Sequence, residues 1–153
     1  MKFARLALLI LLAQILTACG AGPGTPRTID GVWNATLQNS DLSIAYKFSA
    51  TLSQGTGSTV DVSAFGFTSS APCFTAPLGQ SATFSPNGNY KRYQTGPFGM
   101  SITTALMTQV ENVLTLSGTR NADGTISGTW SLKGLGGCSA GSGPFTMTAL
   151  TPL

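Results

Sequence analysis

The residues that could carry acid–base or nucleophilic chemistry are few in this 153-residue chain. It contains no histidine, so a Ser-His-Asp arrangement cannot form. No two carboxylates lie close in sequence, although some could meet in space for acid–base work. The five carboxylates are Asp30, Asp41, Asp61, Glu111 and Asp123. Asp30 and Asp123 flank expected turns, where Asp normally serves hydrogen-bonding geometry. We therefore expect no enzyme, no cofactor and no metal site.

Basic residues are equally sparse, and only Lys91, Arg92 and Tyr93 form a basic-aromatic cluster. That cluster fits contact with an anionic ligand or lipid headgroup, but a solvated strand is the more usual role for such residues. Charged residues make up 8% of the chain, against a usual share of about a quarter. Nucleic-acid binding needs Lys and Arg gathered on one face, so no nucleic-acid partner is expected.

The N-terminal segment has the three-part plan of a secretory signal peptide. Residues 1–5 carry two basic side chains, residues 6–16 form an apolar run, and small residues follow. The apolar run is too short to span a bilayer, which takes about 20 residues. A buried core helix is the alternative, but the positive flank and the N-terminal position favour export.

The segment LTAC at 16–19 resembles a bacterial lipobox. The resemblance implies cleavage after Ala18, a diacylglyceryl group on the sulfur of Cys19 and acylation of the new amino terminus. Several acyl chains anchor a protein stably, whereas one binds membranes only marginally. Gly20 is not the Asp that often retains such proteins at the inner membrane. The expected location is therefore the bacterial cell envelope, lipid-anchored at the outer membrane.

The two other cysteines, Cys73 and Cys138, are expected to form a disulfide, because an exported protein meets an oxidising compartment. A metal site or a catalytic thiol pair is the alternative. The lack of histidine and of C-x-x-C spacing argues against both. The expected organisation is a signal peptide at 1–18, a flexible lipid-anchored tether at 19–28 and one domain at 29–153.

Within the domain, hydrophobic residues repeat every two positions, which predicts strands. The longest alternation, at 42–52, would place Leu42, Ile44 and Tyr46 on the same face as Phe48. Shorter alternations lie at 33–37, 60–64, 82–84, 114–116, 126–132 and 145–149, with turn signals at 55–58, 86–89 and 121–124. Val60, Val62 and Ala64 would share a face. Residues 103–114 fit a helix or a strand, and β-branched flanks without a cap favour a strand.

About eight strands with short turns predict an all-β domain, either a sandwich or, as favoured here, an antiparallel up-and-down barrel. The segment GVW at 31–33 resembles the G-x-W motif of lipocalins and related calycin barrels, which implies that Trp33 caps the narrow end. GVWNA at 31–35 also resembles the opening of small inhibitor-type bacterial lipoproteins. Residues 116–147 resemble secreted, uncharacterised proteins of environmental bacteria.

The predicted function is a lipid-anchored envelope lipoprotein with a non-catalytic barrel, joined to the membrane by its N-terminal anchor. The first hypothesis is that it binds a small apolar ligand, with Trp33, Tyr46, Phe48 and Trp130 lining either a pocket or a core. The alternative is a protein-interaction module, such as an envelope protease or lysozyme inhibitor, acting through loops at one end. A connected apolar cavity on the order of a few hundred Å³ would distinguish the ligand-binding hypothesis from the protein-interaction alternative.

Overall fold

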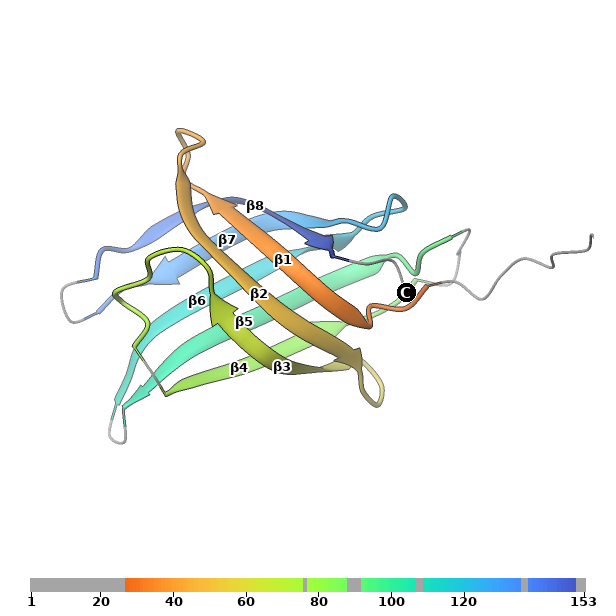
Figure 1. Cartoon of the computed structure of the whole chain (residues 1–153), viewed down its shortest axis with the longest axis horizontal. Coiled ribbons are helices and arrows are strands. Elements are labelled where there is room, and N and C mark those ends of the chain that lie inside the picture. Colours follow the sequence, from red (N-terminus) through yellow and green to blue (C-terminus); the bar gives the residue numbers. More distant parts are fainter. Residues whose placement is uncertain (1–26, 76, 88–91, 107–108, 136–137, 151–153) are drawn as a thin grey trace, which may run out of the picture.

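The computed structural model describes residues 27–75, 77–87, 92–106, 109–135 and 138–150, and these residues form eight strands. The strands are β1 (Gly31–Gln38), β2 (Ile44–Gln54), β3 (Thr59–Phe67), β4 (Leu78–Phe84), β5 (Gly96–Leu106), β6 (Gln109–Arg120), β7 (Ile126–Lys133) and β8 (Gly141–Ala149). Each pairs antiparallel with the next, and β8 returns to β1, so the sheet closes into a barrel (Figure 1). The predicted up-and-down barrel is confirmed.

The barrel has two ends that differ in what they carry. At one end, which we call the terminal end, β1 begins, β8 finishes and the connections 55–58, 85–95 and 121–125 lie. At the other, the disulfide end, lie the connections 39–43, 68–77 and 134–140. Figure 1 shows the terminal end on the right and the disulfide end on the left. The chain therefore enters and leaves the domain at the same end.

The interior is filled by alternate residues of the strands, as the period of two predicted. The expected inward positions on β1 and β7 are buried, and so are Leu114 and Leu116 on β6. The Trp33 Nε1–H donates a hydrogen bond of 2.8 Å to the carbonyl oxygen of Ile29, which satisfies the only polar atom of the buried ring. Trp33 thus lies at the terminal end of the barrel.

The second strand begins later than the expected 42–52. β2 starts at Ile44, and Leu42 lies in the preceding connection with φ of 66°. Leu42 and Ile44 are 65% and 54% exposed, so they do not share the buried face of Phe48. The Asp41 carboxylate accepts hydrogen bonds from the N–H and hydroxyl of Ser43. Local turn chemistry therefore displaces the strand start that hydrophobic alternation alone predicted.

The prediction that Val60, Val62 and Ala64 share a face is wrong for Ala64. Ala64 has φ of 47° and is exposed, and the β2–β3 register shifts between Ser49 and Thr51. This bulge adds one residue to β3 and reverses the alternation after it. As a result Phe65 and Phe67, rather than Ala64, pack against the interior.

Residues 103–114 are not one strand. They hold the end of β5 and the start of β6, and residues 107–108 between them lie outside the described residues. Most of β5 was not predicted as a strand, although Phe98, Met100 and Ile102 alternate with other residues and are all buried. The second half of the turn expected at 86–89, with residues 90 and 91, lies outside the described residues too.

Candidate functional site

The barrel is incompletely paired at one place, between β3 and β4. Only Thr59 with Thr83 and Val60 with Ala82 are in register there, whereas β4 and β5 pair along the whole of β4. Among the described residues, no strand pairs with Asp61–Phe67 on the β4 side of β3, and none pairs with Leu78–Ser81 on the β3 side of β4. We call these two unpaired edges the β3–β4 seam. In Figure 1 the two strands diverge from their paired ends towards the disulfide end.

The seam presents backbone hydrogen-bonding groups. In a strand, the N–H and C=O of alternate residues point to the same neighbour. Phe84 N–H donates to Ser58 C=O, so the groups of Ser58, Val60 and then Val62 face β4. On the other edge, the same alternation directs the backbone N–H and C=O of Gln80 and Leu78 into the seam. The side-chain amide of Gln80 also donates a hydrogen bond of 3.0 Å to the Leu78 carbonyl.

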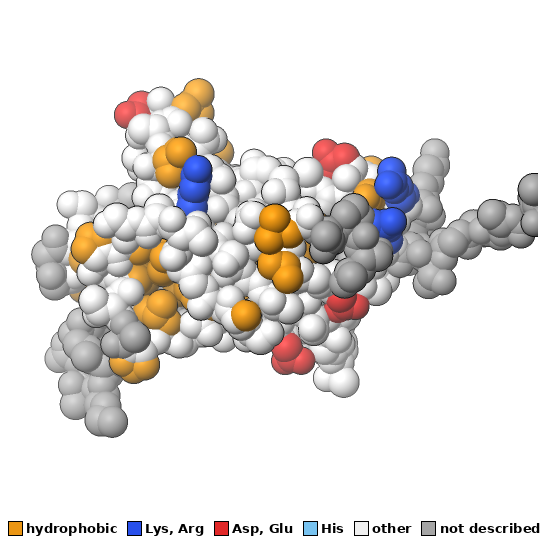
Figure 2. All heavy atoms as spheres, viewed as in Figure 1, with side chains coloured by type: hydrophobic (Ala, Val, Ile, Leu, Met, Phe, Trp, Pro, Cys, Tyr) orange, Lys and Arg blue, Asp and Glu red, His pale blue; other side chains and the backbone are white. Residues whose placement is uncertain are grey.

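Aromatic side chains lie behind the seam. Phe65 and Phe67 are half-buried and pack together with ring centroids 5.3 Å apart, and Phe65 packs on Phe48 at 5.1 Å. Tyr46, also half-buried, contacts Phe67 at 6.0 Å. Burial raises the pKa of Tyr46 above its usual value of 10.0, so its hydroxyl stays neutral at physiological pH. An apolar surface therefore lies behind the unpaired strand edges of the seam. In Figure 2 hydrophobic side chains gather towards the disulfide end, on the left.

The segment that closes the seam at the disulfide end is fixed covalently. Cys73 and Cys138 form a disulfide, as predicted, with Cα atoms 5.9 Å apart. Phe74, next to Cys73, is buried and packs against Phe67 at 5.0 Å and Tyr46 at 5.8 Å. The connection between β3 and β4 is thus pinned to the connection between β7 and β8.

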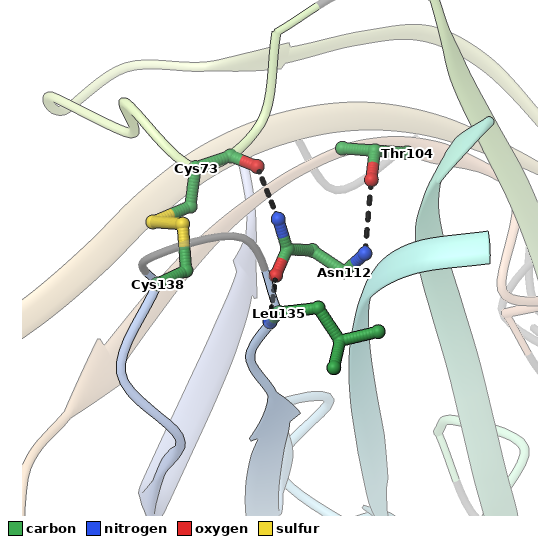
Figure 3. Close-up of a disulfide and its surroundings, with 5 residues drawn as sticks. All are labelled: Cys73, Thr104, Asn112, Leu135 and Cys138. Carbon is green, nitrogen blue, oxygen red and sulfur yellow. Dashed lines mark hydrogen bonds between the residues drawn. A yellow bond between two sulfur atoms is a disulfide. The ribbon is translucent and has the colours of Figure 1, made fainter. Parts of the chain in front are cut away.

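Asn112 of β6 completes this attachment (Figure 3). Its side-chain amide donates to the Cys73 carbonyl at 3.0 Å, and its side-chain oxygen accepts from the Leu135 N–H at 2.9 Å. Its backbone N–H donates to the Thr104 hydroxyl at 3.0 Å. Asn112 and Thr104 are both buried, so each bond satisfies groups that water reaches poorly.

The residues proposed to line a pocket do not form one group. Tyr46 and Trp130 meet edge to face at 5.8 Å near the disulfide end, whereas Trp33 lies at the terminal end. Trp130 Nε1–H donates to the Gln38 carbonyl at 2.7 Å. Phe48, Leu52, Leu114 and Leu116 have no solvent exposure. A side chain with no exposed surface borders no water-sized cavity, so the interior around these four residues is packed. Cys19, the predicted lipidation site, lies outside the described residues.

Two of the described carboxylates, Asp41 and Asp123, accept hydrogen bonds within turns. Hydrogen bonds from the Ser43 side chain and backbone lower the pKa of Asp41, and bonds from the backbone and side chain of Thr125 lower that of Asp123. Among the described residues no group of three or more His, Cys, Asp or Glu could hold a metal ion. Within the same part of the chain, no helix is long and apolar enough to cross a membrane.

Sequence reasoning missed Phe65, Phe67 and Asn112 as site residues. The bulge at Ala64 has no sequence signal, because alanine is not a residue that favours positive φ. Asn112 had one available signal: counting back in twos from Leu116 and Leu114 places it on the inward face. A polar residue at an inward position requires buried hydrogen-bond partners.

No family model, curated protein or solved structure significantly matches this chain.

Proposed function

We propose that this protein is a lipid-anchored lipoprotein of the bacterial envelope, tethered through Cys19 at the outer membrane, whose barrel acts by binding rather than catalysis. Its partner is an extended segment of another envelope protein, which adds as a strand at the β3–β4 seam. The observation that carries the proposal is the restriction of β3–β4 pairing to two residue pairs. It keeps the protein-interaction hypothesis but moves the contact from the loops at one end of the barrel to a strand edge.

The backbone of the seam supports this choice of partner. Unpaired strand edges readily accept another strand, and proteins usually cover or shorten them. Val62 directs its N–H and C=O into the seam from β3, and Gln80 does so from β4. An extended peptide supplies matching donors and acceptors along its length, which gives affinity without a deep pocket.

The half-buried side chains supply specificity. In β-addition, alternate side chains of the incoming strand enter pockets beside the sheet edge. Phe65 and Phe67 offer aromatic surface there, and Phe74 bounds it at the disulfide end. The preferred segment therefore alternates apolar residues with polar ones, the apolar side chains facing these rings.

The position of the seam relative to the proposed anchor is favourable. The described chain begins at the terminal end, where Arg27 N–H donates to Arg92 C=O and Gln94 N–H donates to Arg27 C=O. The two strands of the seam diverge towards the opposite end (Figure 1). A tether that emerges at the terminal end therefore leaves the seam accessible to proteins in the envelope space.

A small apolar ligand is the second candidate, and the half-buried Tyr46, Phe65 and Phe67 favour it. Such a ligand would use the aromatic surface but not the backbone groups of the seam. The packed interior around Phe48 and Leu114 limits it to the surface of the seam.

The test begins in the intact envelope with a photo-crosslinking residue at Ser63 or Ser81, which flank the seam and are exposed. Thr129 on β7 and Thr146 on β8 are exposed control positions away from the seam. The proposal predicts that both seam positions capture one segment of one protein and that the controls do not. A synthetic peptide of that segment should then bind the full-length protein.

Two matched controls separate strand addition from apolar-ligand binding. Methylating alternate backbone nitrogens of the peptide removes its donors but keeps its side chains, and should abolish binding. Val62→Pro removes a donor that faces the seam without breaking the β2–β3 ladder, whereas Val62→Thr keeps it. Binding that survives both N-methylation and Val62→Pro would overturn the proposal. Native mass spectrometry showing a co-purified apolar molecule would instead support the second candidate.

A further inference from the structure

Three arginines surround one tyrosine at the terminal end. The guanidinium carbons of Arg27, Arg92 and Arg120 lie 5.9, 5.3 and 5.5 Å from the centre of the Tyr93 ring. In Figure 2 this end, on the right, shows Lys and Arg side chains. The Tyr93 ring rests against Gly124 of the β6–β7 turn, where an added Cβ would come within 2.8 Å of the ring. Of these four residues, only Arg92 and Tyr93 belong to the basic-aromatic cluster recognised in the sequence.

Arg120 is buried, although it carries a permanent charge. Only 3% of its surface is exposed, and its guanidinium also lies 5.5 Å from the Trp33 ring. Its Nη1–H donates to the Arg27 carbonyl at 3.0 Å. Its Nε and the Nη1 of Arg27 are buried without a hydrogen-bond partner. Unsatisfied donors on buried charged groups are costly and need a reason.

The nearby carboxylate does not supply the missing partner. Asp30 accepts one hydrogen bond on each oxygen, from the Thr28 hydroxyl and the Gln54 N–H, and neither Arg27 Nη1 nor Arg120 Nε is bonded to it. Burial lowers the pKa of Arg120, while Tyr93 and Asp30 act at longer range to favour its charged form. Three guanidinium groups gathered around one ring repel one another, and a bound anion would offset that repulsion.

We propose that the side chains of Arg27, Arg92 and Arg120 form a binding site for a phosphate group. A phosphate carries several acceptor oxygens, and guanidinium groups recognise it through paired, charge-assisted hydrogen bonds. Arg92 is exposed and makes first contact, while the unpaired nitrogens of Arg27 and Arg120 receive the inner oxygens. The tyrosine ring holds the guanidinium groups together through cation–π contacts.

The phosphate has two sources, a lipid headgroup or a free ion, and the lipid source rests on the proposed anchor at Cys19. Arg27 follows Cys19 by eight residues, which span at most about 28 Å and, as a flexible chain, about 15 Å. The cluster would then stay close to the headgroup layer. Phosphate binding itself does not depend on the anchor, so the two ideas can fail separately.

The test observes the arginine Nε–H resonances of the full-length protein by NMR. In detergent, inorganic phosphate should shift the Nε–H resonances of Arg27 and Arg120 saturably. Arg92→Gln should weaken that binding about tenfold, because it removes a charge-assisted contact. Lys133→Gln, an exposed lysine at the disulfide end, is the matched control and should leave it unchanged.

A second arm uses lipid nanodiscs of phosphatidylcholine alone or with phosphatidylglycerol. Both lipids carry a phosphate, so a shift in either kind of disc, absent from phosphate-free detergent, identifies a lipid phosphate as the ligand. A shift only in the discs with phosphatidylglycerol shows that the lipid must also be anionic. A shift with inorganic phosphate and none in either kind of disc identifies a free phosphate. No saturable shift in either arm, or the same loss for Lys133→Gln as for Arg92→Gln, overturns the site.

Discussion

The side chain of Asn112 donates a hydrogen bond of 3.0 Å to the carbonyl oxygen of Cys73, a residue 39 positions earlier in the chain. The same side chain accepts from Leu135, close to the other half of the disulfide. One buried amide and one covalent bond therefore hold the same two connections together. This double attachment fixes Phe74 over the end of the seam and so sets how far β3 and β4 can separate.

Asn112→Ala should lower the free energy of unfolding by about 2 kcal/mol, because it leaves the Cys73 carbonyl and the Leu135 N–H without partners. Chemical denaturation of the oxidised protein measures this. Asn34→Ala on β1, an exposed position, is the control and should change stability by less than about 0.5 kcal/mol. Equal effects of the two substitutions would show that the Asn112 bonds contribute nothing specific.

Removing the disulfide with the pair Cys73→Ala and Cys138→Ala should cost about 4 kcal/mol on the chain-entropy model, since the bond closes a loop with a sequence separation of 65. Combining this change with Asn112→Ala should lower the free energy of unfolding by an amount that differs from the sum of the two separate effects, because both changes act on the same connections. A double-mutant cycle of unfolding free energies measures the coupling. Strict additivity would mean that Asn112 and the disulfide stabilise these connections independently.

Ala50→Leu tests whether the interior is packed. Ala50 is buried on β2 between Phe48 and Leu52, and three added carbon atoms should destabilise a filled interior by about 1–3 kcal/mol. Ala149→Leu adds the same atoms at an exposed position of β8 and should have little effect. Thermal unfolding of both variants gives the comparison. A gain in stability for Ala50→Leu would reveal space for a ligand.

The β6–β7 turn should weaken in acid through Asp123. Thr125 donates backbone and side-chain hydrogen bonds to its carboxylate, which lower its pKa below the usual 3.8. A group whose pKa is depressed by folding stabilises the protein above its unfolded pKa and loses that contribution as pH falls through the folded value. The stability difference between the wild type and Asp123→Asn should therefore shrink below about pH 4. A difference that grows in acid would contradict this sign.

Much of the barrel follows from the alternation of side chains. Trp33 and Leu37 on β1, and Leu114 and Leu116 on β6, are buried as a period of two requires. The disulfide between the two cysteines of the domain was also predicted, on the expectation that the chain is exported. Arg120 continues the same inward series as Leu116, so its burial had a sequence signal. What it contacts depends on Tyr93, which lies in a connection of irregular structure.

The seam had no comparable signal. It arises because Ala64 adopts φ of 47° and because β3 and β4 keep only two residue pairs. Both features depend on how the whole barrel closes, not on the local sequence. Alternation indicates which side chains face inward, but it does not indicate which neighbouring edge stays unpaired.

Residue-resolved amide hydrogen exchange of the isolated full-length protein tests the open seam most directly. The N–H of Val62 faces the seam, whereas those of Asp61 and Ser63 face β2. We expect Val62 to exchange about 100-fold faster than Asp61 and Ser63, because only the latter two are hydrogen-bonded within the barrel. Equal protection of the three amides would show that β3 is paired on both sides and would contradict strand addition at the seam.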